Sequence, residues 1–269
     1  MIKRFLKQLN KVLVISVALI TFVLPSLYLF VMIFMDNSDL TRVPFQFFPS
    51  KFYLGNFFTV FQELPVLVLL CNTLFVCAIT CFISGFISII IGYTIFKVNT
   101  KLSKCCVLFL FVLVLLPTEI FVLTWLEYVG YLNLFNTLFA LTLPNLVSPF
   151  CCLIAYNEIK AIPENVWRSL SLETSSSFCI CFKFVFRHCL GNFKSIFVYI
   201  SMFCWESFMW PLLVNYSLDK LNLTAALTRF MNLHGTNNAV LITASLLFSI
   251  PYTILIIPTL IAKKTREDK

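Results

Sequence analysis

Charged residues are scarce in this sequence. Only 12% of the 269 residues are Asp, Glu, Lys or Arg, whereas a soluble globular domain carries about 25%. Hydrophobic residues make up 60% of the chain, against roughly 45–50% in a soluble domain. A soluble fold could not bury so much apolar surface. The composition therefore excludes an ordinary soluble domain and predicts that the solvent is a lipid bilayer.

Glycine and histidine are also scarce, which excludes several kinds of site. The six glycines form no phosphate-binding G-x-x-x-x-G-K-[ST] loop, so we expect that the chain does not bind ATP itself. The hydrolase patterns G-x-S-x-G and H-E-x-x-H are absent. The two histidines, His188 and His234, are far apart in the sequence. We therefore expect no catalytic residue, no metal site and no cofactor in this chain.

Cysteine, in contrast, is abundant. Most of the eleven cysteines lie inside apolar runs, where a free Cys behaves as a small hydrophobe. Cys179 and Cys181 are separated by one residue, which is too close for an ordinary pair of zinc ligands. We expect the cysteines to be inert packing residues.

Six apolar runs are long enough to cross a bilayer, which takes about 20 helical residues. They cover residues 12–35, 66–96, 105–127, 133–155, 190–214 and 238–262. The first run follows basic residues, as in a signal peptide, but it is too long and no small-x-small cleavage site follows it. The sequence thus predicts an all-α integral membrane protein with six transmembrane helices.

The 20 Lys and Arg residues are distributed unevenly between these runs. With the N-terminus in the cytoplasm, 16 of them lie in or beside cytoplasmic segments, and the external loops hold only Arg42, Lys51, Lys220 and Arg229. This is the positive-inside pattern, and six spans then place both termini in the cytoplasm. The basic residues form no stripe with interleaved aromatics, so the net charge of +8 does not indicate a nucleic-acid partner.

Aromatic residues gather at two predicted outer boundaries. Trp125, Tyr128 and Tyr131 lie near the end of one run, and Trp210 and Tyr216 near the end of another. Amphipathic rings are enriched at the level of the lipid headgroups. We expect these residues to mark the outer membrane surface.

A polar stretch, KAIPENVWRSLSLETSSSF at residues 160–178, interrupts the apolar chain on the predicted cytoplasmic side. Pro163 suits the first position of a helix, and Glu164 complements its positive end. Val166, Leu170 and Trp167 recur at helical spacing with polar residues between them. The pattern predicts a short amphipathic helix outside the lipid. Its apolar ridge favours docking to another protein over a solvated linker.

This passage resembles the cytoplasmic loop of ABC importer permeases, in its sugar-type form I-P-x-E-L-x-E-A-A-x-I-D-G-A-S. The residues that carry the match are Ile162, Pro163 and Ser176 outright, Val166 and Leu172 conservatively, and Glu173 as the acidic residue. The segments 56–76, 116–123, 133–150 and 203–214 resemble further motifs of the same family, in the same order. From about residue 12 to 262, the chain is similar to permease subunits of binding-protein-dependent sugar importers of the maltose and glycerol-phosphate type.

The resemblance implies a fold, a division of the chain and a set of partners. Residues 1–65 would hold an N-terminal transmembrane helix and an external loop. Residues 66–262 would form a five-helix permease core with a cytoplasmic coupling loop at 156–189, and residues 263–269 a cytoplasmic tail. The implied partners are a second permease subunit, identical or different, a cytoplasmic ABC ATPase dimer that binds the ATP, and an extracytoplasmic solute-binding protein. The chain would be a multi-pass protein of the cell (inner) membrane. It would form half of the path for a carbohydrate or related small solute.

The coupling loop would carry the contact with the ATPase. The candidate coupling residues are Ile162, Pro163, Glu164, Val166, Trp167, Arg168, Ser169, Leu170, Glu173 and Thr174. By the resemblance, Val166, Trp167 and Leu170 would form the buried face of the docked helix, with Glu164 and Arg168 as its polar rim.

The loop also departs from the family pattern. The family's E-A-A reads Arg168, Ser169 and Leu170 here, its glycine reads Thr174, and its Leu-Pro reads Phe186 and Arg187. A β-branched Thr tolerates the left-handed conformation poorly. The Ser/Thr cluster 174–177 can form the turn instead and cap the following helix.

Two carboxylates fall inside predicted spans. Glu119 and Glu206 each lie eight residues from the predicted outer end of a run, about 12 Å at helical rise. A carboxylate facing lipid is costly, so each is expected to face the bundle interior or water. With Trp205, they are candidates for the translocation path, where carboxylates would accept hydrogen bonds from sugar hydroxyls. The alternative for each is a packing role as a protonated or helix-bonded Glu.

Two further functions remain open from sequence. One is a secondary transporter in which Glu119 and Glu206 carry protons. The other is an ABC permease for a solute that is not a sugar.

Overall fold

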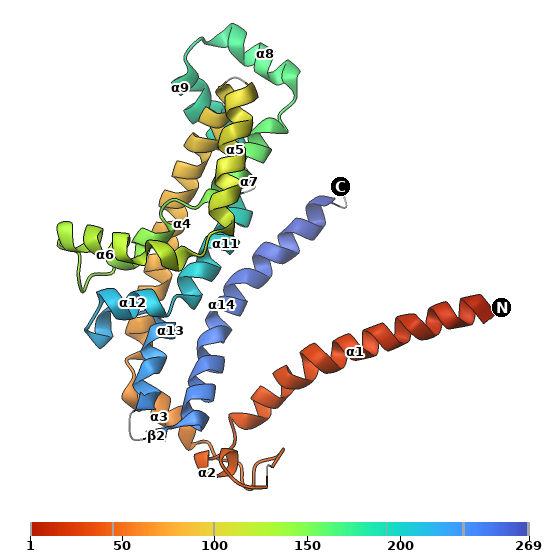
Figure 1. Ribbon diagram of the computed structural model, residues 1–269, viewed down its shortest axis with the longest axis vertical. Coiled ribbons are helices and arrows are strands. Elements are labelled where there is room, and N and C mark those ends of the chain that lie inside the picture. The colour runs from red at the N-terminus through yellow and green to blue at the C-terminus, as the bar shows by residue number, and fades with distance from the viewer. Residues whose placement is uncertain (1, 45, 99, 192, 233–234, 268–269) are drawn as a thin grey trace. The chain divides into compact units, whose positions relative to one another are not determined.

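The computed structural model describes the backbone of residues 2–44, 46–98, 100–191, 193–232 and 235–267, and the side chains of residues 10–44, 46–98, 100–191, 193–231 and 237–258. The described chain is mostly helical (Figure 1). It divides into two compact units, residues 1–66 with 226–253 and residues 67–225 with 254–269. The expected division of the chain at residues 65 and 262 stays a prediction.

The first unit contains α1 (Ile2–Met32), α2 (Asn37–Leu40), α3 (Gly55–Glu63), the two-residue antiparallel strands β1 (Met231–Asn232) and β2 (Gly235–Thr236), and the start of α14 (Asn238–Glu267). The loop after α1 is held by side-chain hydrogen bonds. The Asp39 carboxylate accepts from Ser50 Oγ at 2.6 Å and Ser50 N at 3.0 Å. Asn56 Nδ2 donates to the carbonyl oxygens of Ile33 and Met35. None of the residues in the apolar stretch of α1, Asn10–Met32, is buried, which leaves most of its surface for lipid or another chain.

The second unit is built around α4 (Val66–Lys97), whose buried positions include many small residues. Gly92 shows why. A Cβ at this position would lie 2.8 Å from the backbone nitrogen of Tyr156, on α7 (Pro149–Lys160). The backbones of α4 and α7 therefore approach too closely here for any residue other than glycine.

The other elements of this unit are α5 (Thr100–Leu115), η1 (Thr118–Phe121), α6 (Val122–Tyr131), η2 (Ala140–Asn145), α8 (Glu164–Glu173), α9 (Ser177–Ile180), the π-helical η3 (Cys181–Val185), α10 (Phe186–Cys189), α11 (Phe193–Glu206), α12 (Met209–Val214), η4 (Leu218–Lys220) and α13 (Leu223–Ala226). In Figure 1, α8 and α9 lie beyond the ends of α4 and α5, and α6 runs across the direction of α5.

Three of the six predicted spans are interrupted. The sequence predicts one continuous helix for each of the runs 105–127, 133–155 and 190–214. The structure ends a helix at Leu115 in the first, begins one only at Pro149 in the second, and leaves Ser207 and Phe208 non-helical in the third. Among the described residues, three helices are long and apolar enough to span a membrane, or four if the bent pair formed by α5 and η1–α6 counts as one. The count of six stays a prediction.

The interruptions have local causes. Pro117 takes an extended conformation, with φ −60° and ψ 132°, and the chain bends by 96° between α5 and the following helix. In the second run, Asn133 and Asn136 have φ of 54° and 59°. This left-handed region is incompatible with a continuing α-helix, and Asn visits it more readily than most residues.

The break after α11 frees backbone carbonyls that need new donors. The last carbonyls of a helix have no partner within the helix, and membrane depth offers them little water. Asn222, only 2% exposed, donates from Nδ2 to the carbonyl oxygen of Ser207 at 2.7 Å and to that of Cys204 at 3.5 Å. Thr224 Oγ1 donates to the carbonyl oxygen of Trp205. These two side chains therefore donate hydrogen bonds to the backbone carbonyls that the end of α11 leaves without partners.

We expect the substitution Asn222→Asp to destabilise the protein. An ionised carboxylate has the size of the amide but no donor, so two buried carbonyls would lose their partner and face a negative charge. Leaving buried acceptors unsatisfied costs roughly 1–3 kcal/mol each, so the two carbonyls together cost about 2–6 kcal/mol, and we expect a fall of at least about 4 °C in Tm. Thermal unfolding in detergent measures this.

The matched control is Asn133→Asp, because Asn133 is exposed and Asp tolerates its positive φ. An Asn222→Asp variant as stable as this control would contradict the proposed role of Asn222.

Candidate functional site

A pocket of about 250 Å³ lies in the second unit, where the interrupted runs meet. Its lining residues come from η1, α6, η2, α11 and α12 and from the non-helical residues between α11 and α12. They are Thr118, Glu119, Val122, Trp125, Pro144, Asn145, Phe203, Glu206, Ser207, Phe208, Met209 and Trp210. Irregular backbone at membrane depth is tolerated where it is buried in protein or lines a cavity. Thr118, which follows the break at Pro117, and Ser207, at the break after α11, both line this pocket.

The structure brings Glu119 and Glu206 to this one pocket. The sequence predicts that both residues lie in the middle of continuous helices. The structure places them beside the helix breaks instead. Glu119 is the second residue of η1, and Glu206 is the last residue of α11. Trp205, the third candidate for the translocation path, is 5% exposed and is not among the lining residues.

Two tryptophans of the lining were missed by sequence reasoning, which placed them in an outer aromatic belt. Trp125 and Trp210 pack edge to face, with ring centroids 5.8 Å apart. Trp210 is only 6% exposed, and its Nε1 donates to the carbonyl oxygen of Ala140 at 2.9 Å. The belt assignment is therefore wrong for Trp210, which is buried inside the protein. Prolines 117, 144 and 211 inside the apolar runs were the available signal that these helices are interrupted.

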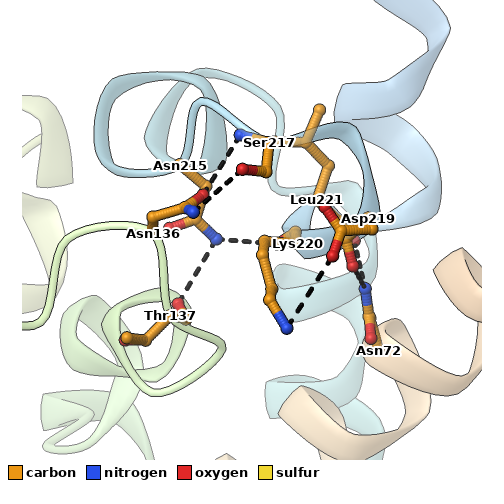
Figure 2. A network of polar contacts seen from close by, with 8 residues as sticks. All are labelled: Asn72, Asn136, Thr137, Asn215, Ser217, Asp219, Lys220 and Leu221. Atoms are coloured by element: carbon orange, nitrogen blue, oxygen red, sulfur yellow. Dashed lines mark hydrogen bonds and ion pairs between the residues drawn. The ribbon is translucent and has the colours of Figure 1, made fainter.

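A polar network fixes the segment that follows α12 (Figure 2). Asn136 and Ser217 form two hydrogen bonds, from Asn136 Nδ2 to Ser217 Oγ at 2.9 Å and from Ser217 N to Asn136 Oδ1 at 3.1 Å. Asn215 Nδ2 donates to the carbonyl oxygens of Thr137 and Lys220. The segment is thereby tied to the loop before η2, which contributes Pro144 and Asn145 to the pocket.

The same segment is also tied to α4. Asn72 Nδ2 donates to the carbonyl oxygens of Asp219 at 2.8 Å and Leu221 at 3.0 Å (Figure 2). One residue further, Thr73 Oγ1 accepts from the backbone nitrogen of Leu223 at 3.0 Å. Residues 219–225 therefore connect α4 to the broken end of α11.

The second candidate site is α8, which forms at the place that the sequence predicts. Pro163 lies one position earlier than expected, as the extended N-cap residue with ψ 144°. Glu164 and Arg168 form an exposed i, i+4 ion pair at 2.9 Å. Ser169 and Glu173 are also exposed, whereas Ile162 is buried.

The apolar face of α8 packs against its own chain. The Trp167 ring stacks on Phe96 with centroids 4.8 Å apart, and it lies 6.3 Å from the ring of Tyr93. Trp167 and Leu170 pack on a buried cluster from α4, α7 and the segment α9–α10. The cluster is Ile89, Tyr93, Ala155, Ile159, Ile180, Cys181, Val185 and Cys189. Val166 is half-buried. Leu172 is the large apolar side chain of α8 that points to the outside, and it is 90% exposed.

The turn after α8 is formed by the Ser/Thr cluster rather than by a left-handed residue. Thr174 is extended, with φ −155° and ψ 138°, so its β-branched side chain is not strained. Ser176 Oγ accepts from Cys179 N at 3.3 Å and caps α9. The substitution of the family glycine by Thr174 is therefore compatible with a coupling helix.

Neither site offers a set of metal ligands. Among the residues with described side chains, no group of three or more His, Cys, Asp or Glu could hold an ion. His234 lies outside the described residues. The expectation that the chain holds no metal or cofactor stays a prediction.

Comparisons with known proteins identify the relatives of the chain. It is 25% identical over 254 residues to the arabinooligosaccharides transport system permease protein AraQ of Halalkalibacterium halodurans, covering 93% of this chain and 91% of that protein. It is 22% identical over 202 residues to the sulfoquinovosyl glycerol transport system permease protein SmoH of Agrobacterium fabrum, covering 74% and 71%. It is 22% identical over 192 residues to the sn-glycerol-3-phosphate transport system permease protein UgpE of Pectobacterium atrosepticum, covering 69% and 68%.

The chain is a homologue of sugar ABC importer permeases. Its fold agrees with this. A chain in the crystal structure of a bacterial ABC transporter involved in the import of the acidic polysaccharide alginate superposes with a TM-score of 0.76 at 14% identity, covering 97% of this chain and 96% of that one. No protein-family profile matches the sequence. This permease homologue is a multi-pass membrane protein.

The packing of α8 in this permease homologue predicts a change in protease sensitivity. We expect Trp167→Ala to increase the rate of trypsin cleavage at Arg168 at least tenfold, because cleavage needs α8 to open locally. Removing a packed indole costs about 2 kcal/mol or more, and 1.4 kcal/mol corresponds to tenfold. Mass spectrometry of the detergent-solubilised protein over time measures the cleavage rate.

Leu172→Ala is the control, since that side chain is exposed. Equal cleavage rates in the two variants would show that Trp167 does not hold α8 in place.

Proposed function

We propose that the chain is the transmembrane permease subunit of an ATP-driven ABC importer. It forms half of the translocation path for a carbohydrate or related small solute and couples to a separate ATPase through α8. The observation that carries this proposal is the similarity to a transport permease over 93% of the chain. The amphipathic α8 and the pocket at the interrupted runs support it, since they supply a coupling element and a mainly apolar cavity that contains two carboxylates.

The remaining parts of the importer follow from this role. A second permease subunit, identical or different, completes the path, and an extracytoplasmic solute-binding protein delivers the solute. A cytoplasmic ABC ATPase dimer binds and hydrolyses the ATP, so this subunit needs no cofactor. The chain crosses the cell (inner) membrane six times with both termini in the cytoplasm. The distribution of Lys and Arg supports this orientation.

The packing suggests how a movement of α8 reaches the pocket. Trp167 contacts Phe96 and Tyr93 near the end of α4, so a displacement of α8 moves that helix. Towards the other end of α4, Asn72 and Thr73 bond the segment 219–225, whose Asn222 holds the last turn of α11. Closure of the ATPase dimer would thus displace α8, α4 and the broken end of α11 together. Packed interfaces of this kind switch between discrete arrangements.

Two of the three residues that the sequence suggests for the ATPase contact, Trp167 and Leu170, pack on their own chain. We assign the ATPase contact to the exposed side of α8, with Leu172 as its apolar centre and the Glu164–Arg168 pair beside it.

The relatives leave the cargo open within this class. Arabinooligosaccharides are uncharged, whereas sn-glycerol-3-phosphate and alginate are anionic. We propose a carbohydrate or a related polar solute as the cargo of this chain, on the combination of aromatic and carboxylate groups in the pocket.

The test of this function is ATP hydrolysis by the purified complex. We expect an ATPase to copurify with the tagged chain when the chain is isolated from membranes of its own cells. The chain itself has no phosphate-binding G-x-x-x-x-G-K-[ST] loop, so the hydrolysis would come from the copurifying subunit. Leu172→Asp places a charge at the proposed contact, where desolvation is costly, and should reduce the hydrolysis per mole of chain at least tenfold.

Val43→Asp is the matched control. Val43 is 91% exposed but lies in the loop that the proposed orientation places outside the cell, so this variant should keep full activity. A purified wild-type sample without ATP hydrolysis, combined with gradient-driven uptake by the chain alone, would replace the proposal with a secondary transporter.

A further inference from the structure

The pocket contains acceptors, amides and aromatic rings but no cationic side chain. Its charged groups are the carboxylates of Glu119 and Glu206, and no Lys, Arg or His is among its lining residues. Asn145, Ser207 and Thr118 add uncharged polar groups. When ionised, a carboxylate accepts hydrogen bonds only. The pocket is therefore suited to a solute that donates hydrogen bonds.

The aromatic rings supply a flat apolar surface next to these acceptors. Trp125 and Phe203 line the pocket together with Trp210. The edge-to-face contact between Trp125 and Trp210 and the hydrogen bond from Trp210 to Ala140 restrict the rotation of both indoles. The C–H bonds of a sugar ring carry a small positive charge and pack on the negative face of an indole. Hydroxyl groups at the edge of the same ring can donate to the carboxylates.

The size of the pocket limits what it can hold. At about 250 Å³, it is slightly below the ~300–1,000 Å³ of pockets that enclose whole drug-sized ligands. It suits one sugar ring rather than an oligosaccharide.

From these observations we propose that the pocket is a subsite for one sugar ring without negative charge, and that Glu119 and Glu206 exclude anionic solutes from it. The inference rests on the proposed function and deepens it, because the relatives do not decide between uncharged and anionic cargo. A carboxylate or phosphate on the solute would meet the two exposed carboxylates of Glu119 and Glu206, with no cationic side chain in the lining to compensate. Like charges repel, and an uncompensated charge of this kind discriminates against a solute without requiring a better fit for its competitor.

A matched set of three monosaccharides tests the proposal. Glucose, glucosamine and glucuronate differ mainly in one substituent, which makes them uncharged, cationic and anionic at about pH 6. Each is titrated into the full-length chain, purified with its copurifying subunits, and the quenching of tryptophan fluorescence is followed. Trp125→Phe identifies the part of the signal that comes from the pocket. We expect saturable quenching by glucose and glucosamine, and a Kd for glucuronate that is at least tenfold higher than that for glucose.

Removing the charges should remove the discrimination. In the double variant Glu119→Gln/Glu206→Gln, the Kd values of glucose and glucuronate should agree within about threefold. Glu127→Gln is the matched control, because Glu127 is an exposed carboxylate on α6 that is not among the lining residues, and it should keep the tenfold difference.

Two results would overturn the proposal. They are equal affinity for glucose and glucuronate in the wild-type protein, and a difference that persists in the double Gln variant. The wild-type comparison does not depend on the folding of any variant. ATP hydrolysis measured in the same sample distinguishes a failure of the sugar-subsite proposal from a failure of the proposed function. A sample that hydrolyses ATP without discriminating the sugars refutes the subsite alone, and a sample without hydrolysis refutes the proposed function.

Discussion

The satisfaction of backbone carbonyls at the broken end of α11 is the constraint on which the pocket depends. A helix that stops inside a membrane leaves acceptors that lipid cannot serve. In this chain, Asn222 and Thr224 supply the donors, and they lie 15 to 19 residues further along the chain than the carbonyls that they bind. That segment is held in turn by Asn72 and Thr73 on α4. The last turn of α11, which carries Glu206, is therefore held by these hydrogen bonds as well as by the packing of the buried Ile200, Cys204 and Trp205.

This arrangement makes α4 the common support of the two candidate sites. Its residues near Lys97 hold the indole of α8, and its residues near Val66 hold the segment that closes the end of α11. Between them, Gly92 lets the backbone of α7 lie directly against α4. A single long helix with small buried residues can thus carry a displacement from one end of the unit to the other without passing through a flexible loop.

The sequence predicted the helical membrane class and the place of α8, because both depend on local composition and spacing. Pro163 and the spacing of Trp167 and Leu170 are sufficient to locate a short amphipathic helix. The helix interruptions were missed because the sequence stays apolar across them. Hydropathy averaged over about 20 residues is hardly changed by a single proline such as Pro117 or Pro144. Asn222 could not be recognised either, since a polar residue in a loop shows no partner until the chain has folded. Trp210 was misplaced because a tryptophan near the end of an apolar run fits an interfacial ring and a buried one equally well.

The length of α4 has a consequence for the bilayer around the protein. Its 32 residues extend about 48 Å at 1.5 Å per residue, and the hydrocarbon layer is only ~30 Å thick. Even a tilt of ~40°, the upper end of the range for membrane helices, leaves roughly 7 Å of helix outside the acyl chains. Tyr93 and Phe96, which contact Trp167 of α8, belong to the last turns of α4. Excess length at this end of α4 would therefore place α8 outside the acyl chains, as the proposed coupling to a cytoplasmic ATPase requires.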